Sequence, residues 1–315
     1  MRTRRGFWVL ALLAGALLVM GACGGASGSG GGEGTGSGED VRVVEHAMGK
    51  TEISGRPERV VVLDTGELDS AMTLGVKPVG AVEAIPGEGF PSYLEGTEEI
   101  EKVGTIEEPN LEKIASLNPD LILSSKLRHE QIYDELSQIA PTVFTETTGV
   151  TWKENFEVHA EALGRTEEAE TVKKEYRARL QEFKEAIGEN PPTVSVVRFL
   201  PGDTRIYQKE SFIGTVLEDA GLPRPPSQDV EEFAILNASK EFIPKMGGDV
   251  IFVTVYGPED ETTKEEITSD PLWRQLEAVQ EDQVYEVSDD LWMLGIGYTA
   301  ANGVIDGLTK HLVEK

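Results

Sequence analysis

The sequence of 315 residues contains one cysteine and only four histidines. A single cysteine cannot form an intrachain disulfide, so no disulfide framework holds this chain. The histidines are scattered, at positions 46, 129, 159 and 311, without a His-Glu-x-x-His motif or a cysteine partner for zinc. The chain also lacks the Gly-x-Ser-x-Gly elbow of serine hydrolases. We therefore expect no catalytic residues, no bound cofactor and no metal ligands.

Basic residues are also scarce, with 29 Lys and Arg against 56 Asp and Glu, and the net charge is −27. Binding to nucleic acid requires a basic footprint, which argues against a nucleic-acid partner. Anionic lipid would repel so acidic a protein, so contact with a membrane is expected through an anchor rather than through a charged face.

No apolar run is long enough to span a bilayer comfortably. The longest, Phe7 to Met20, follows three arginines and ends at Met20-Gly21-Ala22-Cys23. This pattern predicts a signal peptide over residues 1–22. The small residues before Cys23 are similar to a lipobox, which predicts lipidation of Cys23 and a lipid-anchored protein outside the cytoplasmic membrane. The alternative for a lone cysteine is a buried small hydrophobe.

Two regions follow the predicted anchor. Residues 23–40 are almost entirely Gly, Ser, Thr and acid, which predicts a flexible linker. Removing the signal peptide takes three of the 29 basic residues and no acid, so 26 basic residues face 56 acids at a net charge of −30. The remaining chain of about 275 residues is too long for one small core and suits two lobes.

Short apolar strands alternate with helical patterns after residue 58. In the first half we expect strands at 59–63, 77–82, 120–124 and 141–144, and helices at 67–74, 111–117 and 131–139. In the second half we expect strands at 194–199, 250–255 and 284–287, and helices at 212–220, 240–246, 272–276 and 299–313. This alternation predicts an α/β fold of mostly parallel sheets flanked by helices.

A long helical segment separates the two sets. Residues 152–163 predict one helix, and residues 166–187 predict a second, capped by Thr166 and about 33 Å long. Such a helix could bridge two lobes, although two ordinary packed helices would show the same periodicity. The expected divisions are an N-terminal lobe at 41–164, a connecting helix at 165–188 and a C-terminal lobe at 189–315.

Several stretches together resemble one protein family. They are Pro57-Glu-Arg-Val-Val-Val-Leu63, Leu74-Gly-Val-Lys-Pro-Val-Gly80, Val103-Gly-Thr, Pro109-Asn-Leu-Glu-Lys-Ile114, Leu117-Asn-Pro-Asp-Leu-Ile122, Ile139-Ala-Pro-Thr-Val143 and Asp270-Pro-Leu-Trp273. In this order they resemble the helical-backbone (class III) substrate-binding lipoproteins of ABC importers, over residues 55 to 313. The resemblance implies two α/β lobes joined by one long helix, with the ligand in the cleft between them.

The resemblance also implies a function. The family delivers ferric siderophores, haem or cobalamin to a membrane permease and its ATPase, and we expect a monomer that binds a ferric siderophore. The siderophore would supply all the iron ligands. Residues 126–130 and 197–202 resemble the citrate- and hydroxamate-siderophore branch. Haem or cobalamin binding is the alternative within the class, and a lipid-anchored enzyme or adhesion module is the alternative outside it.

Scarce arginines at strand ends are the first candidates for ligand contacts, because a guanidinium donates two hydrogen bonds to one carboxylate. Arg128 follows the strand 121–125, where open α/β sheets bind ligands. Arg198 lies within a strand among apolar residues, where an unpaired charge is costly. Arg205 and Tyr207 are expected in the loop beyond that strand. The alternative for each is a salt bridge with one of the many acids.

Further candidates lie at loops and helix starts. Trp292 and Tyr256 could line the cleft, and Thr65 and Glu67 could contact ligand from the first strand-to-helix loop, although Glu67 could equally cap its helix. Residues 295–300 match a loose dinucleotide fingerprint, but no βαβ unit follows, so we interpret them as a loop and helix start.

By family motif, Glu112 and Glu241 are the carboxylates that would dock on permease arginines, one from each lobe. Both lie near a predicted helix start, where a carboxylate is also favoured by the helix dipole.

Overall fold

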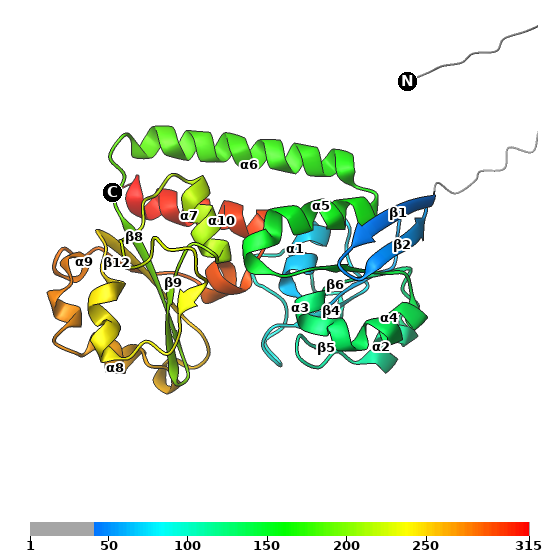
Figure 1. Cartoon of the computed structure of the whole chain (residues 1–315), viewed down its shortest axis with the longest axis horizontal. Coiled ribbons are helices and arrows are strands. Elements are labelled where there is room, and N and C mark those ends of the chain that lie inside the picture. Colours follow the sequence, from blue (N-terminus) through cyan, green and yellow to red (C-terminus); the bar gives the residue numbers. More distant parts are fainter. Residues whose placement is uncertain (1–40, 315) are drawn as a thin grey trace, which may run out of the picture. The chain divides into compact units, whose positions relative to one another are not determined.

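The computed structural model describes residues 41–314, so Cys23, the predicted signal peptide and the predicted linker lie outside it. The described chain contains two five-stranded sheets, one in each of two lobes, and a two-stranded hairpin beside the first (Figure 1). The α/β class and the two sheet-containing lobes are therefore as predicted. Among these residues no helix has the length and apolar character needed to cross a bilayer.

The N-terminal sheet is fully parallel, in the order β5-β4-β3-β6-β7. Its strands are β3 (Val60–Val62), β4 (Gly80–Glu83), β5 (Glu101–Thr105), β6 (Leu121–Ser125) and β7 (Thr142–Thr145). The central strand β3 is three buried valines, as expected for a strand covered on both faces. Its helices are α1 (Thr65–Thr73), α2 (Leu111–Ser116), α3 (Lys126–His129), α4 (Tyr133–Ile139) and α5 (Trp152–Leu163).

The C-terminal sheet is mixed, in the order β10-β9-β8-β11-β12. Strands β8 (Val194–Leu200), β11 (Val250–Val255) and β12 (Val284–Glu286) are parallel, whereas β9 (Asp203–Tyr207) pairs antiparallel with both β8 and β10 (Ala234–Ile235). Its helices are α7 (Phe212–Asp219), α8 (Lys264–Thr268) and α9 (Glu277–Gln280). A 3₁₀ helix spans Lys240–Met246, and a π-helical turn spans Asp290–Leu294.

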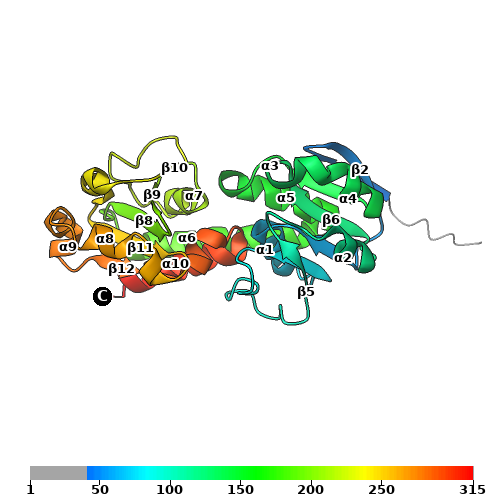
Figure 2. The ribbon, with the colours of Figure 1, turned by 90° about the horizontal axis from the view of Figure 1, so that it is seen from below.

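Two long helices connect the lobes. Helix α6 (Thr166–Ile187) runs along one side of both sheets (Figure 1), and α10 (Tyr298–Leu312) packs against α6 and α1 (Figure 2). Tyr176 of α6, Tyr298 of α10 and Trp152 of α5 form an edge-to-face cluster with centroid distances of 4.7–5.8 Å. This aromatic cluster is part of a hydrophobic core that both lobes share.

The start of α10 is held by a carboxylate from the other lobe. Asp69 of α1 accepts hydrogen bonds from the backbone nitrogens of Thr299, at 3.2 Å, and Ala300, at 3.0 Å. A side chain on the preceding Gly297 would collide with this carboxylate. The Gly295–Ala300 motif is thus a loop and helix start, as predicted, and its second glycine is required by the close approach of Asp69.

The structure corrects several predicted elements. Residues 203–207 form strand β9 rather than a loop, and a β1–β2 hairpin (Val41–His46, Gly49–Ser54) was not predicted. Thr166 does not cap α6, because Arg165 occupies the N-cap position and makes no side-chain cap bond. The predicted helix at 240–246 is a 3₁₀ helix because Pro244 lies inside it.

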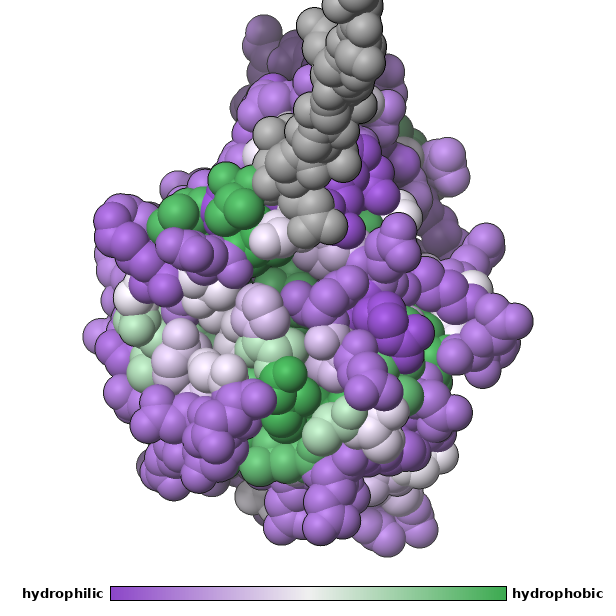
Figure 3. Space-filling model, turned by 90° about the vertical axis from the view of Figure 1, so that its right-hand side faces the viewer, coloured by the Kyte–Doolittle hydropathy of each residue, from purple (hydrophilic) through white to green (hydrophobic). Residues whose placement is uncertain are grey.

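The outer end of the N-terminal lobe is mainly hydrophilic, interrupted by apolar patches (Figure 3). Val41 and Val43 of the hairpin are among the exposed large apolar side chains of the described chain. The hydrophilic character of most of this surface agrees with the acidic composition of the whole sequence.

Candidate functional site

A cavity of about 430 Å³ lies between the two lobes. The first sheet contributes residues that follow the carboxyl ends of β3 and β6, neighbouring strands whose connections diverge, and the second sheet contributes residues of β8 and β9. Such topological switch points are where open α/β sheets bind ligands. We call this cavity the arginine cleft, because Arg128, Arg198 and Arg205 all line it.

Arg128 comes from the N-terminal lobe. It lies in the short helix α3 directly after β6, and its Nε donates to Oδ2 of Asp64, at 2.8 Å. Asp64 is buried at the N-cap of α1, directly after β3. Burial alone would lower the pKa of Arg128, but the Asp64 carboxylate raises it overall, so the arginine is firmly cationic.

Arg198 and Arg205 come from the C-terminal lobe and lie opposite each other on the antiparallel strands β8 and β9. Like charges in such a pair are destabilising. Each arginine therefore has its own carboxylate: Asp289 for Arg198 and Asp203 for Arg205. Sequence reasoning named both arginines but neither aspartate.

The guanidinium of Arg198 is almost fully engaged. Its Nε and Nη2 donate to Asp289 at 2.7 and 2.6 Å, its Nη1 donates to the Tyr207 hydroxyl at 3.3 Å, and the ring of Tyr256 lies 4.8 Å from its carbon. Only 6% of Arg198 is exposed. Burial acts to lower its pKa, but Tyr207 and Asp289 raise it overall.

Apolar side chains border the arginine cleft. Leu127 and Val150 lie on the N-terminal side and Phe233 on the C-terminal side, and all three are exposed in this structure. Phe233 is held against Tyr207 in an edge-to-face contact at 5.4 Å. Sequence reasoning missed these residues because a single apolar residue in a short helix or a loop carries no signal of ligand contact.

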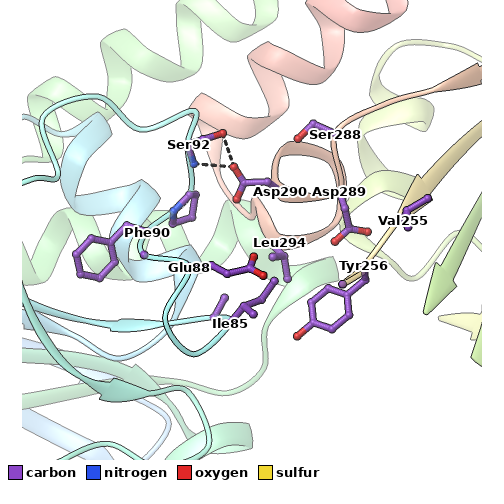
Figure 4. A pocket seen from close by; sticks show the side chains of 14 residues that line it. Ile85, Glu88, Phe90, Ser92, Val255, Tyr256, Ser288, Asp289, Asp290 and Leu294 are labelled. Carbon is purple, nitrogen blue, oxygen red and sulfur yellow. Dashed lines mark hydrogen bonds between the residues drawn. The ribbon is translucent and has the colours of Figure 1, made fainter. Parts of the chain in front are cut away.

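A second cavity of about 390 Å³ also lies between the lobes and shares Leu294 with the arginine cleft. Figure 4 shows its lining, where the Asp290 carboxylate accepts from Ser92 at the backbone nitrogen and hydroxyl, both at 2.6 Å. Tyr256 lines this second cavity rather than the arginine cleft. Its ring contributes to the site by packing on Arg198.

The structure places the remaining predicted ligand contacts, Thr65, Trp292 and Glu67, in helical segments and largely buried. Thr65 lines the arginine cleft but belongs to the first turn of α1, not to a loop. Trp292 also lines it, from a π-helical turn, yet is 2% exposed and packs on Phe252 at 4.7 Å. Glu67 lies inside α1 and does not line the arginine cleft, and Asp64 rather than Glu67 caps this helix.

Glu67 instead faces His159 of α5 across a small buried cavity. His159 Nε2 lies 3.9 Å from Glu67 Oε1, and neither His159 Nε2 nor Glu67 Oε2 has a hydrogen-bond partner among residues 41–314. Burial and then the nearby Asp64 carboxylate raise the pKa of Glu67 to about 8, and burial lowers the pKa of His159 to about 3. The two side chains are therefore a neutral acid and a neutral imidazole, not an ion pair.

The two predicted docking glutamates are both exposed, and neither lines the arginine cleft. Glu112 lies in the first turn of α2, which Asn110 caps by accepting from the Lys113 nitrogen at 2.9 Å. Glu241 lies in the 3₁₀ helix and lines a surface pocket with Glu266. Within residues 41–314 no three His, Cys, Asp or Glu side chains are grouped as metal ligands.

Two lobes with an arginine-lined cleft between them define a binding protein of the two-lobed transport type. Residues 60–291 match the family described as "Periplasmic binding protein", and the chain belongs to this family.

Two similar proteins come from Bacillus subtilis. "Probable siderophore-binding lipoprotein YfiY" is 37% identical over 312 residues, covering 95% of each chain. "Fe(3+)-citrate-binding protein YfmC" is 30% identical over 311 residues, covering 98% of this chain and 97% of the relative. The similarity thus extends over nearly the full length of both relatives.

A solved structure has the same fold. The structure of Staphylococcus aureus SirA complexed with staphyloferrin B has a TM-score of 0.79 and 37% sequence identity. The match covers 86% of this chain and 98% of SirA.

Proposed function

We propose that this protein captures a ferric siderophore outside the cytoplasmic membrane and delivers it to an ABC importer. The observation that carries the proposal is the arginine cleft, where three arginines converge between two lobes of a chain with a net charge of −27. In so acidic a protein, three guanidinium groups gathered in one cleft, each held by an aspartate, are best explained by an anionic ligand.

The chemistry of the arginine cleft favours a chelate with carboxylate or hydroxamate oxygens. Planar guanidinium groups match such oxygens in charge and shape. The exposed Leu127 and Phe233 at the border would cover hydrocarbon parts of the chelate. YfmC is named for Fe(3+)-citrate and SirA was solved with staphyloferrin B, which supports the same ligand class. No protein side chain needs to coordinate the iron, because the chelator supplies its ligands.

Delivery would involve a membrane anchor and a permease with its ATPase. We propose that Cys23 carries the lipid and that residues 23–40 tether the lobes. We also propose that Glu112 and Glu241 dock the loaded monomer on basic side chains of the permease. Both carboxylates are exposed and lie outside the arginine cleft, so docking leaves the ligand site unchanged.

A thermal-shift screen of ferric chelates tests this function. Ferric citrate, ferric hydroxamates, haem and cobalamin are compared with the corresponding iron-free chelators. A ligand present at 100 times its Kd stabilises the folded state by about 2.7 kcal/mol, which is readily visible as a rise in Tm. A shift with haem or cobalamin alone would replace the siderophore proposal, and no shift with any of them would reject a transport function for these ligands.

A further inference from the structure

Two aspartates of the arginine cleft hold their arginines in the same way. In the N-terminal lobe, Oδ1 of Asp64 accepts from the backbone nitrogen of Thr65 at 2.7 Å, and Oδ2 accepts from Arg128 Nε at 2.8 Å. One oxygen thus fixes the carboxylate to the start of α1, and the other fixes the arginine to the carboxylate.

The C-terminal lobe repeats this arrangement with unrelated residues. Oδ1 of Asp203 accepts from the backbone nitrogen of Asn237 at 2.7 Å, and Oδ2 accepts from Arg205 Nε at 2.6 Å. Asp203 stands at the start of β9, two positions before the arginine that it holds. A simple alternative is that both aspartates only neutralise charge, as Asp203 could for the opposed arginines of β8 and β9.

The atoms involved argue against neutralisation alone. A carboxylate binds an arginine most strongly through two parallel bonds, as Asp289 binds Arg198. Asp64 and Asp203 each give one oxygen to Nε and the other to the backbone. Among residues 41–314, no carboxylate holds the terminal nitrogens Nη1 and Nη2 of Arg128 or Arg205, although Arg205 also makes a side-chain hydrogen bond with Tyr207. Both arginines line the same cavity from opposite lobes.

We propose that Asp64 and Asp203 are positioning residues that hold Arg128 and Arg205 by Nε and present their terminal nitrogens to the cleft. The ligand is then a ferric chelate with at least two free carboxylates, one for each lobe. Arg198 already donates Nε and Nη2 to Asp289. It therefore contributes positive charge and a hydrogen bond to the Tyr207 hydroxyl. This inference rests on the proposed siderophore function and specifies its ligand class.

Asparagine substitutions of Asp64 and Asp203 distinguish a role in positioning the arginines from a role in neutralising their charge. In Asp64→Asn the side chain would keep one oxygen, which can either cap α1 or accept from Arg128 Nε, and its amide group would face the other donor. Loss of a negative charge beside the cleft should by itself tighten the binding of an anion. Loss of positioning should weaken it, so the two explanations predict opposite signs.

The test measures affinity for ferric citrate in Asp64→Asn and Asp203→Asn. Asp260→Asn is the matched control, because it removes the same charge from an exposed residue that does not line the cleft. We expect each positioning variant to lose about tenfold in affinity, which corresponds to about 1.4 kcal/mol. In an Arg128→Ala background, Asp64→Asn should cause no further loss, because it acts through that arginine.

A measurement without ligand accompanies the titration. In the wild type, NMR should show slowly exchanging Nε–H signals for Arg128 and Arg205, and each should exchange faster in its own aspartate variant. Unchanged exchange, unchanged or tighter binding, or additive losses with Arg128→Ala would each overturn the proposal. Equal affinity for ferrioxamine B, a chelate without free carboxylates, would overturn its ligand class. If the wild type binds neither chelate, the siderophore function fails, while the NMR signals still decide the positioning role.

Discussion

At the scale of single residues, the three cleft arginines differ in what their nitrogens can still bind. Arg198 donates two parallel hydrogen bonds to Asp289 and is almost completely buried. Arg128 and Arg205 each donate only Nε to their aspartate, and Arg205 also hydrogen-bonds Tyr207. The sequence predicts equal roles for Arg128 and Arg198, because it shows only that both are scarce cations near strand ends. The structure shows that Asp289 occupies both Nε and Nη2 of Arg198, whereas Asp64 and Asp203 bond only Nε of Arg128 and Arg205.

We expect Arg198→Ala to destabilise the fold as well as to weaken ligand binding. Removing the guanidinium leaves the largely buried Asp289 carboxylate without its partner, and loss of one partner of a buried pair costs about 3–5 kcal/mol. Arg128→Ala should lose about 1.5–3 kcal/mol of binding free energy with a smaller change in stability, because Asp64 keeps its bond to Thr65. Urea denaturation and chelate titration of both variants check this, and a fully stable Arg198→Ala variant contradicts it.

Glu67 and His159 predict a pH dependence of stability. The pKa of Glu67 rises from its ordinary 4.5 to about 8 in the folded state, and the pKa of His159 falls from 6.5 to about 3. From pH 4.5 to 6.5 the two effects cancel, since the folded and unfolded states bind equal numbers of protons. From pH 6.5 to 8 the folded state alone keeps the Glu67 proton, so stability falls by up to about 1.4 kcal/mol per pH unit.

The comparison is between the wild type and Glu67→Gln, in denaturation at pH 6, 7 and 8. Glutamine cannot ionise, so the variant should lose less stability than the wild type across this range. Subtracting the two curves removes the contributions of the many other acids. Parallel curves would show that Glu67 is already ionised at neutral pH.

At the scale of elements, the start of α10 fixes how the lobes meet. Gly297→Ala should push the Asp69 carboxylate away from the Thr299 and Ala300 nitrogens and cost about 1–3 kcal/mol. Gly247→Ala is the matched control, because its added carbon meets only ordinary contacts at 3.4 Å or more. Chemical denaturation of both variants measures the difference, and equal stability would show that the segment relaxes without cost.

The predicted elements were correct where the apolar pattern and the flanking turn residues indicated the same boundaries. The valines of β3 and the apolar stripe of α6 gave correct types and near-correct bounds. Strand β9 was missed although Pro201-Gly202 is a two-residue hairpin turn and Thr204 and Ile206 alternate with cleft-facing residues. Its polar residues Arg205 and Tyr207 suggested a loop, because they line the arginine cleft and do not contribute to an apolar strand pattern.

At the scale of the whole molecule, the site combines residues that the sequence cannot pair. Asp64 and Arg128 are 64 positions apart, and Arg198 and Asp289 are 91 apart. The arginines stand out because cations are scarce in this chain, but any of 56 acids could be their partners. The proposed boundaries of the lobes, at residues 164 and 188, lie at the two ends of α6 and remain predictions.

Docking to the permease is expected to depend on Glu112 and Glu241. Changing both to Lys places like charges against the permease and should reduce iron-chelate uptake by cells several-fold or more. Siderophore binding in solution should be unchanged, because neither residue lines the arginine cleft. Changing the exposed Glu135 and Glu281 to Lys gives the same charge change as a control. Normal uptake by the first double variant would refute this docking assignment.

The most direct test of the arginine cleft as the ligand site is calorimetric titration of ferric citrate into the wild type and into an Arg128→Ala/Arg205→Ala variant. We predict one binding site per chain in the wild type and an affinity at least about 100-fold lower in the double variant, since two charge-assisted contacts are lost. Wild-type affinity in a folded double variant would contradict this prediction, because the chelate would then bind outside the arginine cleft.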